Sequence, residues 1–200
     1  MSRADVEEII DIIKKELHYV DEKSYAIPVG GYRRGKENNG DLDIILSSRS
    51  GSVSCLLDRL IDSLMGKDYL KYKLWHSTEV KAYRKPAIPS KKPGAHQTFD
   101  SFEKCFCAFL QPSKNKLRQV DLICVRPQQV VTAVLGWTGS RQFERSLRDY
   151  AKKEKSMNVS SEYIHLEEKD GSMKKISVSS EEEAFKVIGI PYLDPEMRNC

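Results

Sequence analysis

Two aspartates one residue apart, Asp41 and Asp43, have the spacing in this sequence that most directly points to chemistry. They lead into the apolar run Ile44-Ile45-Leu46, which is typical of a buried strand. Alternate residues of a strand point to the same face, so the two carboxylates would lie side by side. Such close carboxylates repel one another unless a cation lies between them, and oxygen ligands of this kind suit Mg²⁺ carrying substrate phosphates.

A glycine turn lies just upstream, where Gly30 and Gly31 follow a strand predicted from Tyr25 to Val29. Because glycine has no Cβ, a phosphate could approach the backbone N–H groups here, and a helix starting at the turn would add its positive end. Arg34 and Lys36 could supply the counter-charge. Strand, glycine turn, basic residues and paired acids together predict a metal-dependent site for nucleotidyl transfer.

Each of these features alone has a plainer interpretation. Most isolated Asp-x-Asp pairs are solvated residues at strand ends, and most Gly-Gly pairs are simple turns. The order of the features, with an apolar strand directly after the acids, favours a functional site.

The composition is that of a globular protein. With 200 residues, 40% of them apolar and 31% charged, the chain can form one large domain or two small ones. The net charge of +4 is mild and identifies no partner by itself. Because no apolar run has the length of a bilayer span and no signal-peptide pattern is present, we expect a soluble, intracellular protein.

The cysteines are scattered and odd in number. The spacing of Cys105 and Cys107 is that of alternate strand residues and is wrong for a zinc knuckle, and no second pair exists. We expect structural thiols in a reducing compartment.

Periodicity predicts the elements that position the acids. Apolar residues recur at helical spacing at 3–20 and at about 53–65, with Gly66 as the stop of the second helix. Further strands are expected at 69–74, 79–83, 102–110 and 119–125. The segment from Arg84 to Asp100 is rich in Pro and Lys and has no period, so it is either a solvated surface loop or a functional one.

The last third of the sequence predicts helices with a hairpin. A helix at 128–135 precedes a Thr-Gly-Ser turn at 138–140, which caps a second helix running to about Lys155. A hairpin is predicted to turn at Asp170-Gly171, and a capping box at Ser180 starts a short helix that ends at Gly189.

Over almost its full length, the sequence resembles the family X DNA polymerases. The strings Gly-Gly-Tyr-Arg-Arg-Gly-Lys at 30–36 and Gly-Asp-Leu-Asp at 40–43 are similar to the family's nucleotide-binding and metal-binding signature. Val-Asp-Leu-Ile at 120–123 is similar to the strand with its third catalytic carboxylate. Gly-Trp-Thr-Gly-Ser at 136–140 resembles the terminal-transferase and mu-like branch, which has Gly-Trp where most members have Tyr-Phe.

The resemblance implies three catalytic metal ligands, Asp41, Asp43 and Asp121. It also implies a set of residues that bind the nucleotide or face the nascent base pair and template: Gly30, Gly31, Arg34, Lys36, Gly40, Gly136, Trp137, Thr138, Gly139, Arg141, Glu144, Arg145 and Arg148. In the family the Gly-Trp pair lies against the sugar of the incoming nucleotide. A glycine here in place of tyrosine predicts weak discrimination between deoxy- and ribonucleotides.

The family's architecture implies an α/β (α+β) fold. A nucleotidyltransferase palm at 1–127 would have a mixed or antiparallel sheet backed by the two amphipathic helices, and a small helical thumb with a hairpin would follow at 128–200. Because the sequence begins at the first palm helix, we expect the lyase-like and fingers domains of the family to be absent.

By the same resemblance, the protein would be a DNA polymerase or DNA nucleotidylexotransferase in repair and end joining. Its cofactor would be Mg²⁺, with Mn²⁺ able to substitute. Its partners would be a DNA primer, template or end, a nucleoside triphosphate and end-joining proteins, with no membrane, and it would be a nuclear monomer. Two alternatives stay open: another nucleotidyltransferase, acting on RNA or a protein, and a non-catalytic scaffold fragment that binds DNA ends.

One position departs from the family pattern. Members usually have arginine two residues before the third aspartate, where this sequence has Gln119 next to Arg118. The orientation of Asp121 is therefore open. The markers of branches within the family are mixed, because Gly31, Gly136 and Trp137 side with the terminal-transferase and mu-like branch, whereas Gly40 is a feature of polymerases beta and lambda.

Overall fold

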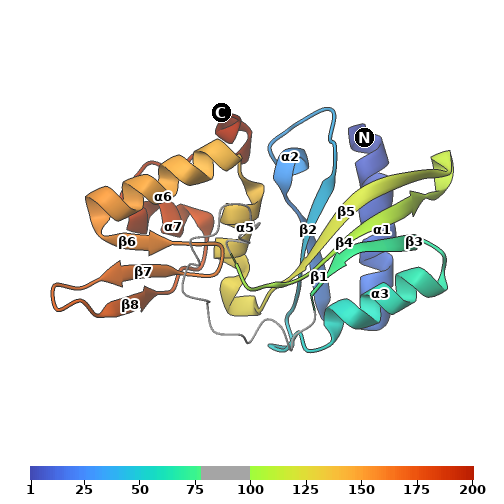
Figure 1. Ribbon diagram of the computed structural model, residues 1–200, viewed down its shortest axis with the longest axis horizontal. Helices are drawn as coiled ribbons and strands as arrows, with labels where there is room; N and C mark the ends of the chain where they lie inside the picture. Colours follow the sequence, from blue (N-terminus) through green and yellow to red (C-terminus); the bar gives the residue numbers. More distant parts are fainter. Residues whose placement is uncertain (78–99) are drawn as a thin grey trace, which may run out of the picture.

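The computed structural model describes residues 1–77 and 100–200. We call the part from α1 to β5 the N-terminal half and the part from α5 to the C-terminus the C-terminal half; Figure 1 shows them side by side. The strand expected at 79–83 and all but the last residue of the segment from Arg84 to Asp100 lie outside the described residues.

A five-stranded mixed sheet, with the strand order β1-β2-β5-β4-β3, forms the centre of the N-terminal half. Its strands are β1 (Ser24–Pro28), β2 (Leu42–Ser48), β3 (Leu70–His76), β4 (Glu103–Gln111) and β5 (Lys116–Cys124). Strand β2 pairs with β5 in parallel, and the other neighbours pair antiparallel. The expected α/β fold with a mixed sheet is confirmed.

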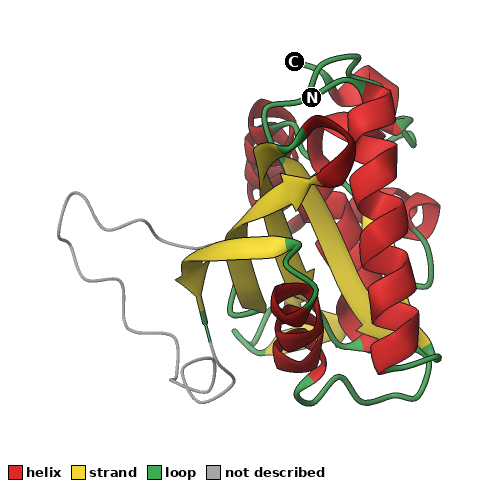
Figure 2. Cartoon of the chain, turned by 90° about the vertical axis from the view of Figure 1, so that its right-hand side faces the viewer, coloured by secondary structure: helices red, strands yellow, loops and turns green. Residues whose placement is uncertain are grey.

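Two helices cover one face of this sheet, as predicted. Helix α1 (Arg3–Val20) begins with a capping box in which Ser2 and Asp5 bond each other's backbone, and α3 (Leu56–Gly66) packs beside it. Their apolar stripes and the inward residues of the strands form one buried core. Figure 2 shows the long helix α1 running along the sheet.

Helix α5 (Val130–Thr138) covers part of the opposite face. It packs Ala133 and Val134 against Ile45 and Ile123 of the two central strands. The sequence predicted that this helix ends at Leu135, which is wrong. The helix continues for another turn, because Thr138 Oγ1 donates to the carbonyl of Val134 and Gly139 takes the C-cap position. The Gly-Trp pair therefore lies inside the helix.

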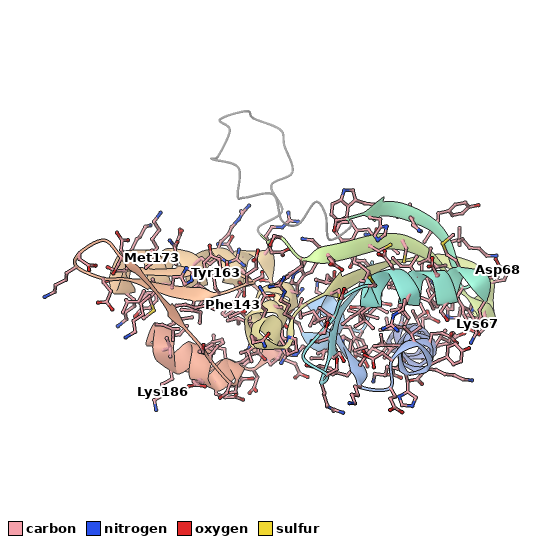
Figure 3. The ribbon with its side chains drawn as sticks, turned by 90° about the horizontal axis from the view of Figure 1, so that it is seen from below. Lys67, Asp68, Phe143, Tyr163, Met173 and Lys186 are labelled. Atoms are coloured by element: carbon pink, nitrogen blue, oxygen red, sulfur yellow. The ribbon has the colours of Figure 1, made fainter. Side chains whose placement is uncertain are left out.

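The rest of the C-terminal half is a small α+β unit. Its elements are α6 (Arg141–Lys155), β6 (Met157–Val159), β7 (Ile164–Glu167), β8 (Met173–Ile176) and α7 (Glu181–Ile188). Ser140 and Ser180 cap their helices as predicted, and the hairpin turns at Asp170-Gly171. Strand β6, which completes a three-stranded sheet, was not foreseen. Figure 3 shows Met173 of the hairpin at the opposite end of the molecule from Asp68.

The remaining helices are short. They are α2 (Gly30–Arg33), η1 (Pro112–Lys114), η2 (Pro127–Gln129) and η3 (Pro195–Arg198). Helix α2 is the single turn that the glycine pair starts.

A buried ionic cluster joins the two halves. Arg33 of α2 donates to both carboxylate oxygens of Glu181 at the start of α7, and also to Thr138 Oγ1 at 2.7 Å. Arg198 donates to the same carboxylate at 2.8 Å, with its guanidinium 5.0 Å from the ring centre of Phe185. Arg198 is completely buried, and Glu181 is only 9% exposed. The position of α2 against the C-terminal half therefore depends on this cluster.

None of the helices within residues 1–77 and 100–200 has the length and apolar character needed to cross a membrane.

We expect Glu181→Ala to destabilise the protein strongly, because it leaves the Arg198 guanidinium buried without its carboxylate. Breaking a buried ion pair from one side costs about 3–5 kcal/mol, which urea denaturation would show as a lower unfolding midpoint. Glu182→Ala, at the exposed neighbouring position, should change the free energy of unfolding by less than about 0.5 kcal/mol. Equal effects of the two changes would contradict the role of the cluster.

Candidate active site

The parallel pairing of β2 with β5 brings two of the three predicted acids together. Asp43 and Asp121 are direct partners in the register of the two strands. Asp121 is 8% exposed, and Asp43 is half-buried. Asp41 lies in the bend just before β2 and is exposed. The three acids thus lie at the start of β2 and on the adjacent strand β5, and they range from exposed to buried.

Burial and mutual repulsion raise the pKa values of the two strand acids. The pKa of Asp43 rises to about 7, first through burial and then through the charges of Asp41 and Asp121, against the pull of Arg34. Burial raises the pKa of Asp121 to about 6, and the charge of Asp41 adds to the effect. Both carboxyl groups are therefore held where burial favours their neutral forms.

Gly30 makes room for one of these acids. Its φ is +60°, and a Cβ built on it would lie well inside 3.0 Å of Asp43 Oδ2, a separation that real Cβ atoms essentially never show. The amide of Val29 donates to the carbonyl of Asp43 at 2.9 Å, so the turn and the strand are joined directly. The first glycine therefore leaves room for the carboxylate of Asp43.

Gln119 takes the place of the expected arginine. Its Nε2 donates to Asp121 Oδ1 at 3.2 Å, which lowers the pKa of that carboxyl against the effect of burial. Arg118 does not reach Asp121; its Nε donates to Gln111 at 2.9 Å, and Nη2 lies 3.3 Å from Asp5. The side-chain amide of Gln119 therefore orients the Asp121 carboxylate, which the sequence alone could not decide.

Arg34 links the acids to the C-terminal half. Its Nη1 donates to the carbonyl of Thr138 and its Nε to Asn199 Oδ1 at 2.9 Å. Burial lowers its pKa, while the charges of Asp43 and Asp41 favour its charged form. The guanidinium is thus held near the carboxylates by two contacts from across the joint.

A cleft of about 840 Å³ separates the two halves beside the acids. Most of the predicted site residues line it: Gly30, Gly31, Arg34, Lys36, Gly40, Asp41, Asp43, Gly136, Trp137, Gly139, Arg141, Glu144, Arg145 and Arg148. Asp121 lies outside the lining, next to Asp43. Thr138 is fully buried in the joint, where it accepts from Arg33.

The cleft also contains residues that the sequence did not single out: Asn38, Asn39, Asp100, Lys104, Phe106, Asp149 and Ser161. Strand alternation could have found Phe106, which pairs with Asp121 in the β4–β5 register and so shares its face. No local signal marks Ser161, because it reaches the cleft only through the turn between β6 and β7.

A second buried ion pair positions the predicted tryptophan. Lys104 is 2% exposed and pairs with Asp100, whose other oxygen accepts from Trp137 Nε1 at 3.2 Å. The ammonium also lies 5.5 Å from the centre of the Trp137 ring. The ring is therefore held from the N-terminal half, and its indole N–H is satisfied.

Glu144 of α6 is a buried acid with one oxygen unused. It is 6% exposed, its Oε2 pairs with Arg148 at 3.1 Å, and its Oε1 has no hydrogen-bond partner in the part of the chain that the structure describes. Burial raises its pKa to about 7, against the charges of Arg148 and Arg198. The carboxyl can therefore accept a hydrogen bond from a ligand in the cleft.

Metal binding requires ligands that converge on one point. Within the described ranges, no three Asp, Glu, His or Cys side chains are grouped so as to hold a metal ion as they stand. The carboxyl groups of Asp41, Asp43 and Asp121 nevertheless offer only oxygen donors, and the charge of Asp41 helps to raise the pKa values of the other two.

Two family models match the chain. The model described as DNA polymerase beta palm matches residues 1–127, and the one described as DNA polymerase beta thumb matches residues 133–199.

Curated relatives match over the whole chain. The DNA nucleotidylexotransferases of Xenopus laevis and Homo sapiens are each 30% identical, over 218 and 216 residues, in alignments that cover 100% of this chain. The DNA-directed DNA/RNA polymerase mu of Homo sapiens is 27% identical over 213 residues and 99% of this chain. The chain spans 41% of the length of each of these relatives.

The raised pKa of Glu144 predicts a pH-dependent loss of stability. The neutral Glu144 carboxyl makes its full contribution to folding stability below pH 4.5, the pKa of the residue in the unfolded chain. This contribution is lost as pH rises through about 7, the pKa in the folded chain, because the unfolded chain ionises the residue more easily. Glu144→Gln should remove this loss, worth up to about 3 kcal/mol, in urea titrations between pH 5 and 8. Glu154→Gln, on the exposed side of the same helix, should keep the wild-type profile. A wild-type profile in Glu144→Gln would contradict the prediction.

Proposed function

The chain belongs to the family of DNA polymerase beta, as its resemblance to family X implied, and we propose that it transfers nucleotides from nucleoside triphosphates to the 3′-hydroxyl of DNA. The 3′-oxygen would form a bond to the α-phosphorus while the bond to the bridging oxygen breaks, so that pyrophosphate leaves and the hydroxyl proton is released. The terminal-transferase and polymerase mu relatives support this reaction class.

The observation that carries the proposal is the pairing of Asp43 with Asp121 on adjacent parallel strands, beside a cleft with a basic glycine turn. Paired acids supply charge where cations must bind, and Arg34 and Lys36 supply the opposite charge where phosphates must lie. A structural role does not explain two adjacent acids, one half-buried and one buried, whose pKa values are both raised.

The donor set fits Mg²⁺, with Mn²⁺ as its substitute. Asp41, Asp43 and Asp121 would hold the ions, since their oxygens are hard donors and the charge of Asp41 raises the pKa values of Asp43 and Asp121. When bound, such ions activate the 3′-hydroxyl and neutralise charge on the reacting phosphate. Gln119 would keep Asp121 oriented through its bond to Oδ1.

The remaining residues of the cleft would bind the rest of the substrates. The glycine turn with Arg34 would hold the β- and γ-phosphates, Gly136 and Trp137 would flank the sugar, and helix α6 would face the nascent base pair and template. The residues of α6 in this role are Arg141, Glu144, Arg145 and Arg148. Glu144 would use its free oxygen as an acceptor there.

The finer assignments remain our proposals. We divide the chain into a palm at 1–127 and a thumb at 128–200, and we expect a DNA end or primer as the acceptor. The roles in repair and end joining and the nuclear location follow from the family resemblance alone. Whether addition needs a template is decided by the experiment below.

Primer extension with Mg²⁺ or Mn²⁺ tests the activity. We expect the chain to extend a single-stranded primer or a short gapped duplex, and Asp43→Ala and Asp121→Ala to lower incorporation by about a thousandfold while the circular dichroism spectrum is kept. Asp62→Ala, on the exposed side of α3, is the matched control with full activity. Turnover that survives in both variants would contradict the assignment, and the preferred DNA would show whether addition is templated.

Metal binding can be measured without activity. We expect millimolar Mg²⁺ to raise the Tm of the wild-type chain, because a ligand that binds only the folded state stabilises it. The shift should be lost in Asp43→Asn and kept in Asp62→Asn. An equal shift in all three proteins would mean that the ions bind elsewhere.

A further inference from the structure

We propose that Ser161 determines how the site treats the sugar of the nucleotide, by giving a hydrogen-bond partner to the 2′-hydroxyl of a ribonucleotide. The inference rests on the function proposed above. It assigns selectivity to a residue of the β6–β7 turn that no sequence motif marks.

Ser161 fills the space that Gly136 leaves open. A Cβ built on Gly136 would lie well inside 3.0 Å of Ser161 Oγ, 3.1 Å from Ser161 Cβ and 3.3 Å from Ser161 Cα. The glycine is therefore required by the serine, because any larger residue would displace the hydroxyl or the turn that carries it. The two residues form a single unit on the wall of the cleft.

The hydroxyl of Ser161 is available to a ligand. The residue is 4% exposed and lines the cleft, and its Oγ makes no hydrogen bond to another residue of the described chain. The neighbouring Ser160 differs, since its Oγ accepts from the amides of Glu162 and Tyr163 at 3.1 and 3.2 Å. The Oγ of Ser161 can therefore donate to, or accept from, a ligand hydroxyl in the cleft.

The function proposed above places the sugar of the nucleotide next to this serine. Arg34 and Lys36 suit the phosphates, and Gly136 and Trp137 would flank the sugar. Ser161 lies directly against Gly136 on the same wall of the cleft, and its neutral hydroxyl suits a sugar hydroxyl. A ribose offers a 2′-hydroxyl to Oγ, whereas a deoxyribose leaves Oγ unpaired, so the same contact favours the ribonucleotide.

Steady-state kinetics of Ser161→Ala test the proposal. We expect the ratio of kcat/KM for ATP to kcat/KM for dATP to fall about 3- to 10-fold, as loss of one neutral hydrogen bond predicts. Ser146→Ala, an exposed serine of α6 outside the cleft, is the matched control and should keep the wild-type ratio. An unchanged or higher ratio in Ser161→Ala would overturn the proposal.

A second variant tests the same contact from the other side. Gly136→Ala must displace the Ser161 hydroxyl, so it should lower the ratio at least as far as Ser161→Ala does. A ratio in Gly136→Ala that equals or exceeds the wild-type ratio would overturn the proposal. If the wild-type chain incorporates neither nucleotide, the proposed function fails with this inference, whereas an active chain with an unchanged ratio in Ser161→Ala overturns only the inference.

Discussion

The parallel pairing of β2 with β5 is the constraint on which the site depends. It aligns Asp43 with Asp121, and the bond from the Val29 amide to the Asp43 carbonyl ties the glycine turn to the same strand. A slip of one residue would turn Asp43 into the helix-covered core and bring an apolar side chain to the cleft. Leu42 and Ile44, both 1% exposed beneath α1 and α3, hold the register against such a slip. The packing of the two amphipathic helices thus fixes the chemistry on the other face.

The second constraint is the joint between the halves. Arg33 and Arg34 are neighbours in sequence but reach different partners: Arg33 meets Glu181, and Arg34 meets the carbonyl of Thr138. Both contacts start from the turn around the short helix α2, which also carries the glycines. The wall of the cleft formed by α5 is therefore positioned by the same turn that makes room for Asp43. Burying Arg198 among aromatic rings makes the arrangement costly to change, which favours one geometry of the joint.

Local patterns predicted the elements well because they are set by periodicity and capping. The apolar stripe of α1, the cap at Ser140 and the turn at Gly189 depend only on nearby residues. Asp41 and Asp43 were found for the same reason, since their spacing is a local property, whereas Asp121 and the expected fold came from the family resemblance. Partners distant in sequence could not be found in this way. One case is Glu181, the partner of Arg33. Another is Ser161, which packs against Gly136. Gly136 also lies inside a helix that runs past its predicted end.

The electrostatics of the cleft couple its ligands to one another. Asp43, Asp121 and Glu144 are all held where burial favours their neutral forms, so the folded chain keeps acidic groups that it would be more stable without. A cation at the edge of the sheet relieves the repulsion among the first two, and in doing so it makes the cleft less repulsive to a polyphosphate. Linkage is reciprocal, so if a bound cation raises the affinity for a triphosphate by some factor, a bound triphosphate raises the affinity for the cation by the same factor. The acids that weaken the free fold are therefore what would make cation binding and triphosphate binding depend on each other.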